Sequence, residues 1–154
     1  MSANPYATPE APVEDPPRKP GSPVKAVLAG LAIDVGGSLL VGVLMTILYA
    51  GSLASRGMSD DEIAAALAKA PDDPAIFIVG SLAGGALSLL GGFVAARIAR
   101  RDEYRVGAIL AALAALIGFG LSWDAYTPIQ NALLTLLTAG AVMLGVRLGR
   151  VPQS

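Results

Sequence analysis

The chain has 154 residues, of which 54% are hydrophobic and 15% are charged, and its formal net charge is −1. It contains no cysteine and no histidine, which excludes disulfides, thiol nucleophiles, imidazole bases and the metal sites that these side chains form. Four apolar stretches reach the length of about 20 residues that crosses a bilayer, at residues 25–50, 75–97, 105–122 and 128–147. We therefore predict an all-α integral membrane four-helix bundle over residues 24–150, with no cofactor.

Residues 1–23 precede the first predicted span. This segment contains seven prolines and few side chains that could pack into a core. Such a composition is typical of disordered segments. We predict a disordered, proline-rich cytoplasmic tail.

The first predicted span carries a single carboxylate, Asp34, in an otherwise uncharged stretch from Ala26 to Tyr49. A charged aspartate at the centre of a membrane helix costs about 2.5–3.5 kcal/mol. An ionisable residue at this depth therefore indicates a structural or functional role, and Asp34 is the first candidate site residue.

The connection between the first two spans contains a helix start. Ser59 and Glu62 have the spacing of a capping box, in which each side chain bonds the backbone amide of the other residue. Small and apolar residues then recur on one face as far as Pro71. We predict a short amphipathic helix at about residues 60–70, on the outer membrane surface or across the mouth of the bundle. Asp73-Pro74 and Thr127-Pro128 predict the starts of the second and fourth spans.

Small residues recur at four-residue spacing along the spans, which favours close approach of helix backbones in a membrane. The first span carries Gly30 and Gly37 on this pattern, and the second carries Gly84 and Gly92. These residues serve packing within the chain, or they form the face of a homodimer.

The basic residues define a topology. Nine of the eleven Lys and Arg residues fall on one side of a four-span arrangement, so the positive-inside rule places both termini in the cytoplasm. Four of them lie in the short loop between the second and third spans. They fix the topology, and they are candidates for contact with anionic membrane lipid. These four are Arg97, Arg100, Arg101 and Arg105.

Three polar residues lie at the same predicted depth. Asp34, Ser88 and Thr138 are each nine residues from a basic residue at the cytoplasmic boundary, or about 13 Å at 1.5 Å per residue. With Ser38, one turn beyond Asp34, they form a candidate intramembrane polar layer. This layer clamps the helices together, couples a proton or an ion, or contacts a polar residue of a partner protein.

Gly91-Gly92-Phe93-Val94-Ala95-Ala96-Arg97, followed by a basic hairpin and Gly107, resembles the small uncharacterised four-helix integral membrane proteins of bacteria. The resemblance covers about 40 residues of the second and third spans. It implies a four-span fold in a bacterial inner membrane, and it carries no active-site residues to transfer.

No phosphate-binding loop, dinucleotide fingerprint or nucleophile elbow occurs in the sequence, and a single intramembrane carboxylate does not make an aspartyl protease. The basic loop is too short for nucleic-acid binding. We expect a non-enzymatic accessory, assembly or regulatory subunit that binds a membrane protein or itself. The alternative is a small oligomeric transporter or channel that uses Asp34.

Overall fold

The computed structural model describes residues 21–150, and this part of the chain is all-α with no strand. The predicted tail falls outside the described residues, apart from its last three positions. The elements are α1 (Pro23–Leu31), η1 (Ala32–Gly36), α2 (Gly37–Ala54), α3 (Asp60–Lys69), η2 (Ala70–Asp72), α4 (Pro74–Ala99), α5 (Glu103–Ser122) and α6 (Pro128–Gly149).

Four helices are long and apolar enough to cross a membrane. The first is the continuous rod α1–η1–α2 (Pro23–Ala54), and the others are α4, α5 and α6. The four predicted spans and the short loop helix are therefore confirmed. The first span extends four residues beyond its predicted end, to Ala54.

The helix starts follow from their capping residues. The Ser59 hydroxyl accepts from the Glu62 amide, and the Glu62 carboxylate accepts from the Ser59 amide at 2.8 Å, which confirms the predicted capping box. Asp73 Oδ1 accepts from the amides of the second and third residues of α4. Thr127 caps α6 and forms a second capping box with Gln130. These caps satisfy backbone amides that have no partner within the helix.

Helix α4 is the centre of the bundle. It packs most extensively against α6, and it also contacts α1, η1 and α5. Within residues 21–150, α1 and α6 do not contact each other, so α4 lies between them. This order of helices decides which polar side chains can meet.

The half of the bundle that contains α1 is closely packed through small residues. A Cβ at Gly92 would overlap the Val142 carbonyl, and a Cβ at Gly30 would press on Leu110 and the Gly91 carbonyl. The buried core is formed here by alanine, valine and leucine side chains. Helices in lipid associate through such close backbone approach, so this half forms the rigid part of the fold.

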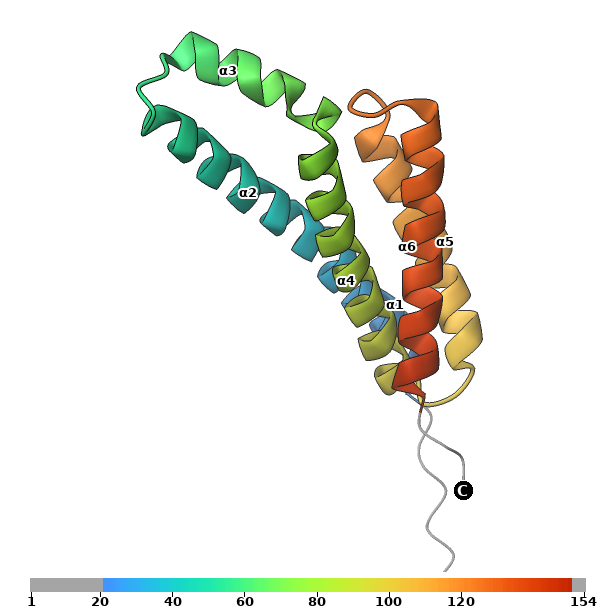
Figure 1. Cartoon of the computed structure of the whole chain (residues 1–154). Helices are drawn as coiled ribbons and strands as arrows, with labels where there is room; N and C mark the ends of the chain where they lie inside the picture. Colours follow the sequence, from blue (N-terminus) through green and yellow to red (C-terminus); the bar gives the residue numbers. More distant parts are fainter. Residues whose placement is uncertain (1–20, 151–154) are drawn as a thin grey trace, which may run out of the picture.

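The other half is open. Helix α2 diverges from α4, and α3 crosses from the far end of α2 back to the start of α4 (Figure 1). Of the eighteen residues in α2, only Leu53 is buried. Three helices, α2, α3 and α4, therefore frame an opening on one side of the bundle.

The predicted packing glycines divide between these two halves. Gly30 and Gly92 lie at close helix contacts, and a Cβ at Gly37 would be 3.0 Å from a Leu87 methyl group. A Cβ at Gly84 would meet nothing within 4 Å. Gly84 thus makes no intrachain helix contact, because α2 has already diverged from α4 at its level.

Candidate functional site

Asp34 lies in η1, a π-helical turn between α1 and α2. Single π-turns inside α-helices are rare and occur frequently at functional sites. The turn ends at Gly36 and is followed by Gly37, which lies against Leu87 of α4. Asp34 therefore marks the point at which the first span leaves the packed half of the bundle.

The Asp34 carboxylate accepts a hydrogen bond of 2.6 Å from the Ser88 hydroxyl of α4. Both side chains are buried, with exposed fractions of 4% and 2%. Two residues that are 54 positions apart in the sequence thus form a hydrogen bond, and both are nine residues from a basic residue. The bond ties the π-turn to the central helix.

Ser38 and Thr138 do not join this pair. Ser38 lies one turn further along, on the diverging α2, and Thr138 lies on α6, which α4 separates from α1 and which makes no contact with η1 within residues 21–150. Both residues instead line a groove that begins next to the Asp34–Ser88 pair. The predicted four-residue layer is therefore one hydrogen-bonded pair and two groove residues.

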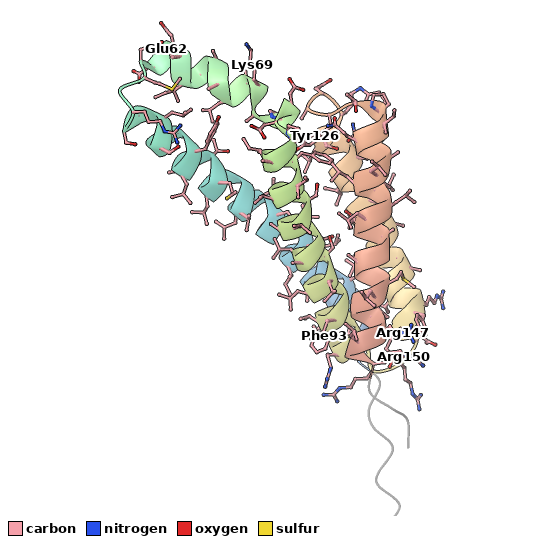
Figure 2. The ribbon with its side chains drawn as sticks, viewed as in Figure 1. Glu62, Lys69, Phe93, Tyr126, Arg147 and Arg150 are labelled. Atoms are coloured by element: carbon pink, nitrogen blue, oxygen red, sulfur yellow. The ribbon has the colours of Figure 1, made fainter. Side chains whose placement is uncertain are left out.

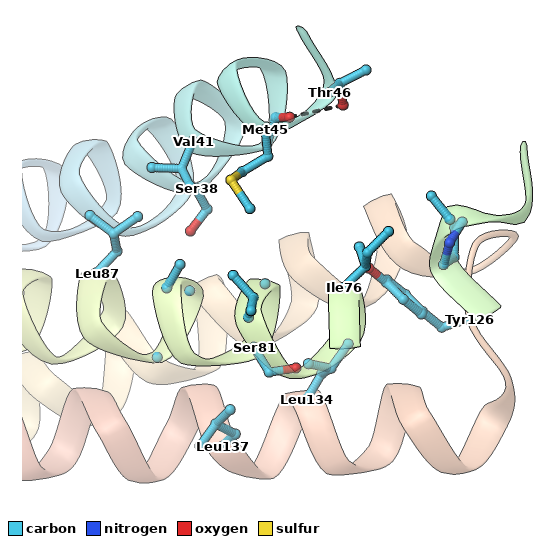
Figure 3. A pocket seen from close by; sticks show the side chains of 18 of the residues that line it. Ser38, Val41, Met45, Thr46, Ile76, Ser81, Leu87, Tyr126, Leu134 and Leu137 are labelled. Atoms are coloured by element: carbon cyan, nitrogen blue, oxygen red, sulfur yellow. Dashed lines mark hydrogen bonds between the residues drawn. The ribbon is translucent and has the colours of Figure 1, made fainter. Parts of the chain in front are cut away.

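The groove has a volume of about 570 Å³ and lies between α2 on one side and α4 with α6 on the other. It is narrow beside Leu87 and widens toward Tyr126 and the α3 end (Figure 3). Its volume falls within the range of about 300–1,000 Å³ that is typical of ligand sites.

The two faces of α2 differ in composition. The face that borders the groove carries small and polar residues among larger ones, namely Ser38, Val41, Gly42, Met45, Thr46 and Tyr49. The opposite face carries only large aliphatic side chains, all exposed, namely Leu39, Leu40, Val43, Leu44, Ile47 and Leu48. Aliphatic residues suit contact with lipid tails, whereas small and polar residues in membranes occur at helix–helix interfaces.

Two of the six hydroxyl groups that line the groove are satisfied within their own helix. Thr46 donates to the Gly42 carbonyl at 2.9 Å, and Ser81 donates to the Phe77 carbonyl at 2.7 Å. Such bonds to the preceding turn leave the hydroxyl without a free proton. The groove is therefore lined mainly by apolar side chains, together with the hydroxyl groups of Ser38, Tyr49, Tyr126 and Thr138.

A second buried polar contact joins α5 and α6 near their connection. The Ser122 hydroxyl donates to the Asn131 side-chain oxygen at 2.5 Å, and the Asn131 amide group donates to the Tyr126 carbonyl at 3.2 Å. This pair was not predicted from the sequence. A signal for this contact was present in the sequence, because Ser122 and Asn131 are nine residues apart and flank the connection between two spans.

The four arginines in and beside the α4–α5 connection are all exposed. Together with Arg147 and Arg150 of α6 they surround one end of the bundle, which we call the arginine end. Arg147 and Arg150 lie at the opposite end of the molecule from Glu62 and Lys69 of α3 (Figure 2). The structure thus brings together the arginines that were predicted to contact lipid, and it adds two from the last span.

No family model, curated protein or solved structure matches the chain. The fold and the side chains described above are therefore the basis for any functional conclusion.

Proposed function

We propose that the chain is a non-enzymatic membrane subunit that binds another membrane protein through the groove between α2 and α4. The observation that supports this is the composition of α2, whose small and polar face borders an open groove. In a membrane such a face packs against another helix, and α4 is too distant to fill this role along most of α2.

Facing glycines strengthen the proposal. Gly42 of α2 and Gly80 and Gly84 of α4 all line the groove, and a Cβ at any of them would meet nothing within 4 Å. Glycines at four-residue spacing allow a helix backbone to approach closely. The same spacing is used for packing in the other half of this bundle, so the open glycines offer an equivalent surface to a partner.

We place this subunit in a bacterial inner membrane, with both termini in the cytoplasm. The support is the distribution of charge, because the arginine end carries the excess of basic residues that the positive-inside rule associates with the cytoplasm. The resemblance to small bacterial four-helix proteins supports the same location.

The test is native mass spectrometry of the tagged chain after mild extraction from its own membrane. We expect a second polypeptide at fixed stoichiometry. The partner should be lost from Gly42→Leu and Gly84→Leu, which fill the groove, and retained by Gly118→Leu. Gly118 on α5 is a matched control, because a Cβ there also meets nothing within 4 Å.

A homo-oligomer without a partner, or equal retention of the partner by all three variants, would contradict the proposal. A homo-oligomer would favour the second candidate, a small transporter or channel that couples flux to Asp34. The observation in its favour is the buried Asp34–Ser88 pair beside a groove that Ser38 and Thr138 also line. For that candidate, Asp34→Asn should abolish proton- or ion-dependent flux while the oligomer stays intact.

A further inference from the structure

The arginine end carries a strong excess of positive charge. Among residues 21–150 it contains six arginines and Lys25, against Asp102 and Glu103, which leaves a formal excess of seven minus two, or five. The α3 end has Arg56 and Lys69 against six acidic residues, a formal balance of two minus six, or minus four. The two ends of the molecule therefore differ sharply in the ions that they attract.

Two of the arginines are held in place by aromatic rings. The Arg97 guanidinium lies 5.1 Å from the centre of the Phe93 ring. Arg150 donates to the Tyr104 hydroxyl at 3.1 Å, and its guanidinium lies 4.6 Å from the centre of that ring. A guanidinium has five N–H donors, so Arg150 keeps most of them for another acceptor. An arginine that is already positioned loses less conformational freedom when it binds an anion.

A third arginine occupies a position where glycine would fit better. Arg100 ends α4 with a φ of 56°, in the left-handed region that disfavours residues with a Cβ. Glycine is the usual residue at such a helix end because it has no Cβ. The chain instead places a long cation there, in a connection of only three residues, Arg100–Asp102, between α4 and α5.

The acidic residues nearby do not neutralise this surface. Glu103 is buried, with an exposed fraction of 7%, whereas the six arginines are exposed. Among residues 21–150, the only side-chain hydrogen bond from these arginines goes to the uncharged Tyr104. The guanidinium groups are therefore exposed at one end of the bundle, and no carboxylate of residues 21–150 forms an ion pair with them.

We propose that the arginine end binds the headgroups of anionic phospholipids in preference to zwitterionic ones. Guanidinium groups bind phosphate oxygens through paired N–H donors, and anionic headgroups add a net charge that zwitterionic headgroups lack. Basic residues at a membrane surface attract such lipids. This inference does not depend on the proposed partner in the groove.

The test uses the purified full chain in detergent micelles, to which phosphatidylglycerol or phosphatidylcholine is added. Lipid adducts are counted by native mass spectrometry over a range of lipid concentrations. A detergent micelle does not separate two compartments, so the role of the arginines in setting membrane topology cannot affect the result. We expect phosphatidylglycerol adducts at much lower lipid concentration than phosphatidylcholine adducts.

Three variants sharpen the test. Arg101→Gln with Arg105→Gln should raise the dissociation constant for phosphatidylglycerol by about 25-fold, at roughly fivefold for each arginine. Arg56→Gln with Lys69→Gln, at the other end, should leave it unchanged. Arg100→Gly should weaken binding but raise the thermal stability of the chain, because glycine relieves the left-handed backbone. That variant separates loss of binding from loss of folding.

Equal binding of the two lipids would overturn the inference, and so would unchanged phosphatidylglycerol binding in the double arginine variant. Competition by glycerol phosphate at concentrations equal to the lipid would also overturn it, because the site would then be one for free phosphate esters. A variant that changes the recovery of the partner polypeptide but not the number of lipid adducts would test only the proposed function of the groove.

Discussion

Asp34 combines three unusual properties in one residue: it is the single carboxylate of the first span, it is buried, and it lies in a π-turn. A π-turn is less favourable than an α-turn and persists where a tertiary contact holds it. The bond from Ser88 supplies such a contact, at the position where α2 begins to diverge. The pair therefore fixes the place from which the open half of the bundle extends.

The strength of this pair can be measured by a double-mutant cycle with Asp34→Ala and Ser88→Ala. Ser88→Ala alone should destabilise the fold by about 1–3 kcal/mol, because it leaves the buried carboxyl group without its partner. The coupling energy should be about 0.6–1.7 kcal/mol, the range measured for hydrogen bonds between membrane helices. Reversible unfolding in mixed micelles, followed by circular dichroism, gives all four free energies.

A coupling energy of zero would show that the two residues act independently. Thr138→Val is the matched control, because Thr138 is a membrane hydroxyl at the same predicted depth that does not bond Asp34. It should show no coupling to Asp34→Ala.

At the level of single residues, the sequence allowed part of this site to be predicted. Asp34 stood out because charges are rare in a span, and Ser88 followed from its distance to a basic boundary. Thr138 satisfied the same distance rule, yet it lies on the far side of α4 from η1. The depth of a residue in the membrane can be predicted from its spacing to a basic boundary residue. The arrangement of the helices around α4 depends on tertiary packing, which residue spacing does not reveal.

Among the elements, α3 depends on its capping box. The Ser59 backbone amide and hydroxyl both bond the Glu62 carboxylate, and these bonds hold the pKa of Glu62 below its ordinary value. A carboxylate with a lowered pKa in the folded state stabilises the fold above its ordinary pKa. This contribution is lost as the pH falls through the lower, folded-state pKa.

We therefore expect the first turn of α3 to fray as the pH falls below the ordinary range of glutamate, near 4.3. Amide hydrogen exchange at residues 59–63 measures this opening. Glu62→Gln keeps an acceptor for the Ser59 amide but cannot titrate, so its exchange should show no such transition. A transition of equal size in Glu62→Gln would assign the effect to another group.

The two kinds of glycine in α4 allow a second comparison between elements. Gly92→Ala should destabilise the bundle by about 1–3 kcal/mol, because the Val142 carbonyl occupies the place of the new methyl group. Gly84→Ala should cause no loss, since its position is open. Unfolding of both variants in mixed micelles tests this difference. Equal destabilisation would mean that α2 closes on α4 in the membrane.

The elements themselves were predictable to within a few residues, because length and hydropathy define a span and caps define its start. The division of the glycines between the closely packed half and the open half of the bundle was not predictable. Gly84 and Gly92 belong to one stripe with eight-residue separation, yet Gly92 lies against the Val142 carbonyl of α6, whereas Gly84 lines the groove that the diverging α2 leaves open. The sequence around Asp34 has no residue pattern that requires a π-turn.

For the whole molecule, the absence of cysteine permits a direct test of topology. Asp61→Cys and Arg101→Cys place single thiols in exposed positions at opposite ends of the molecule. A membrane-impermeant maleimide added to intact cells should label Asp61→Cys. It should label Arg101→Cys only after the membrane is permeabilised. The reverse pattern would place the arginine end outside the cell and contradict the assignment of both termini to the cytoplasm.

The spans also differ in length. At about 1.5 Å per residue, α5 and α6 measure about 30 and 33 Å, which matches a hydrocarbon core of about 30 Å. The rod α1–η1–α2 has 32 residues and measures about 48 Å. A helix longer than the hydrocarbon core is accommodated by tilting, by kinking or by local thickening of the bilayer, and a thinner membrane increases the mismatch. The Asp34–Ser88 pair fixes the α1–η1 end of this rod to α4. We therefore expect a change in tilt to occur in α2, so that the thickness of the bilayer determines the width of the groove.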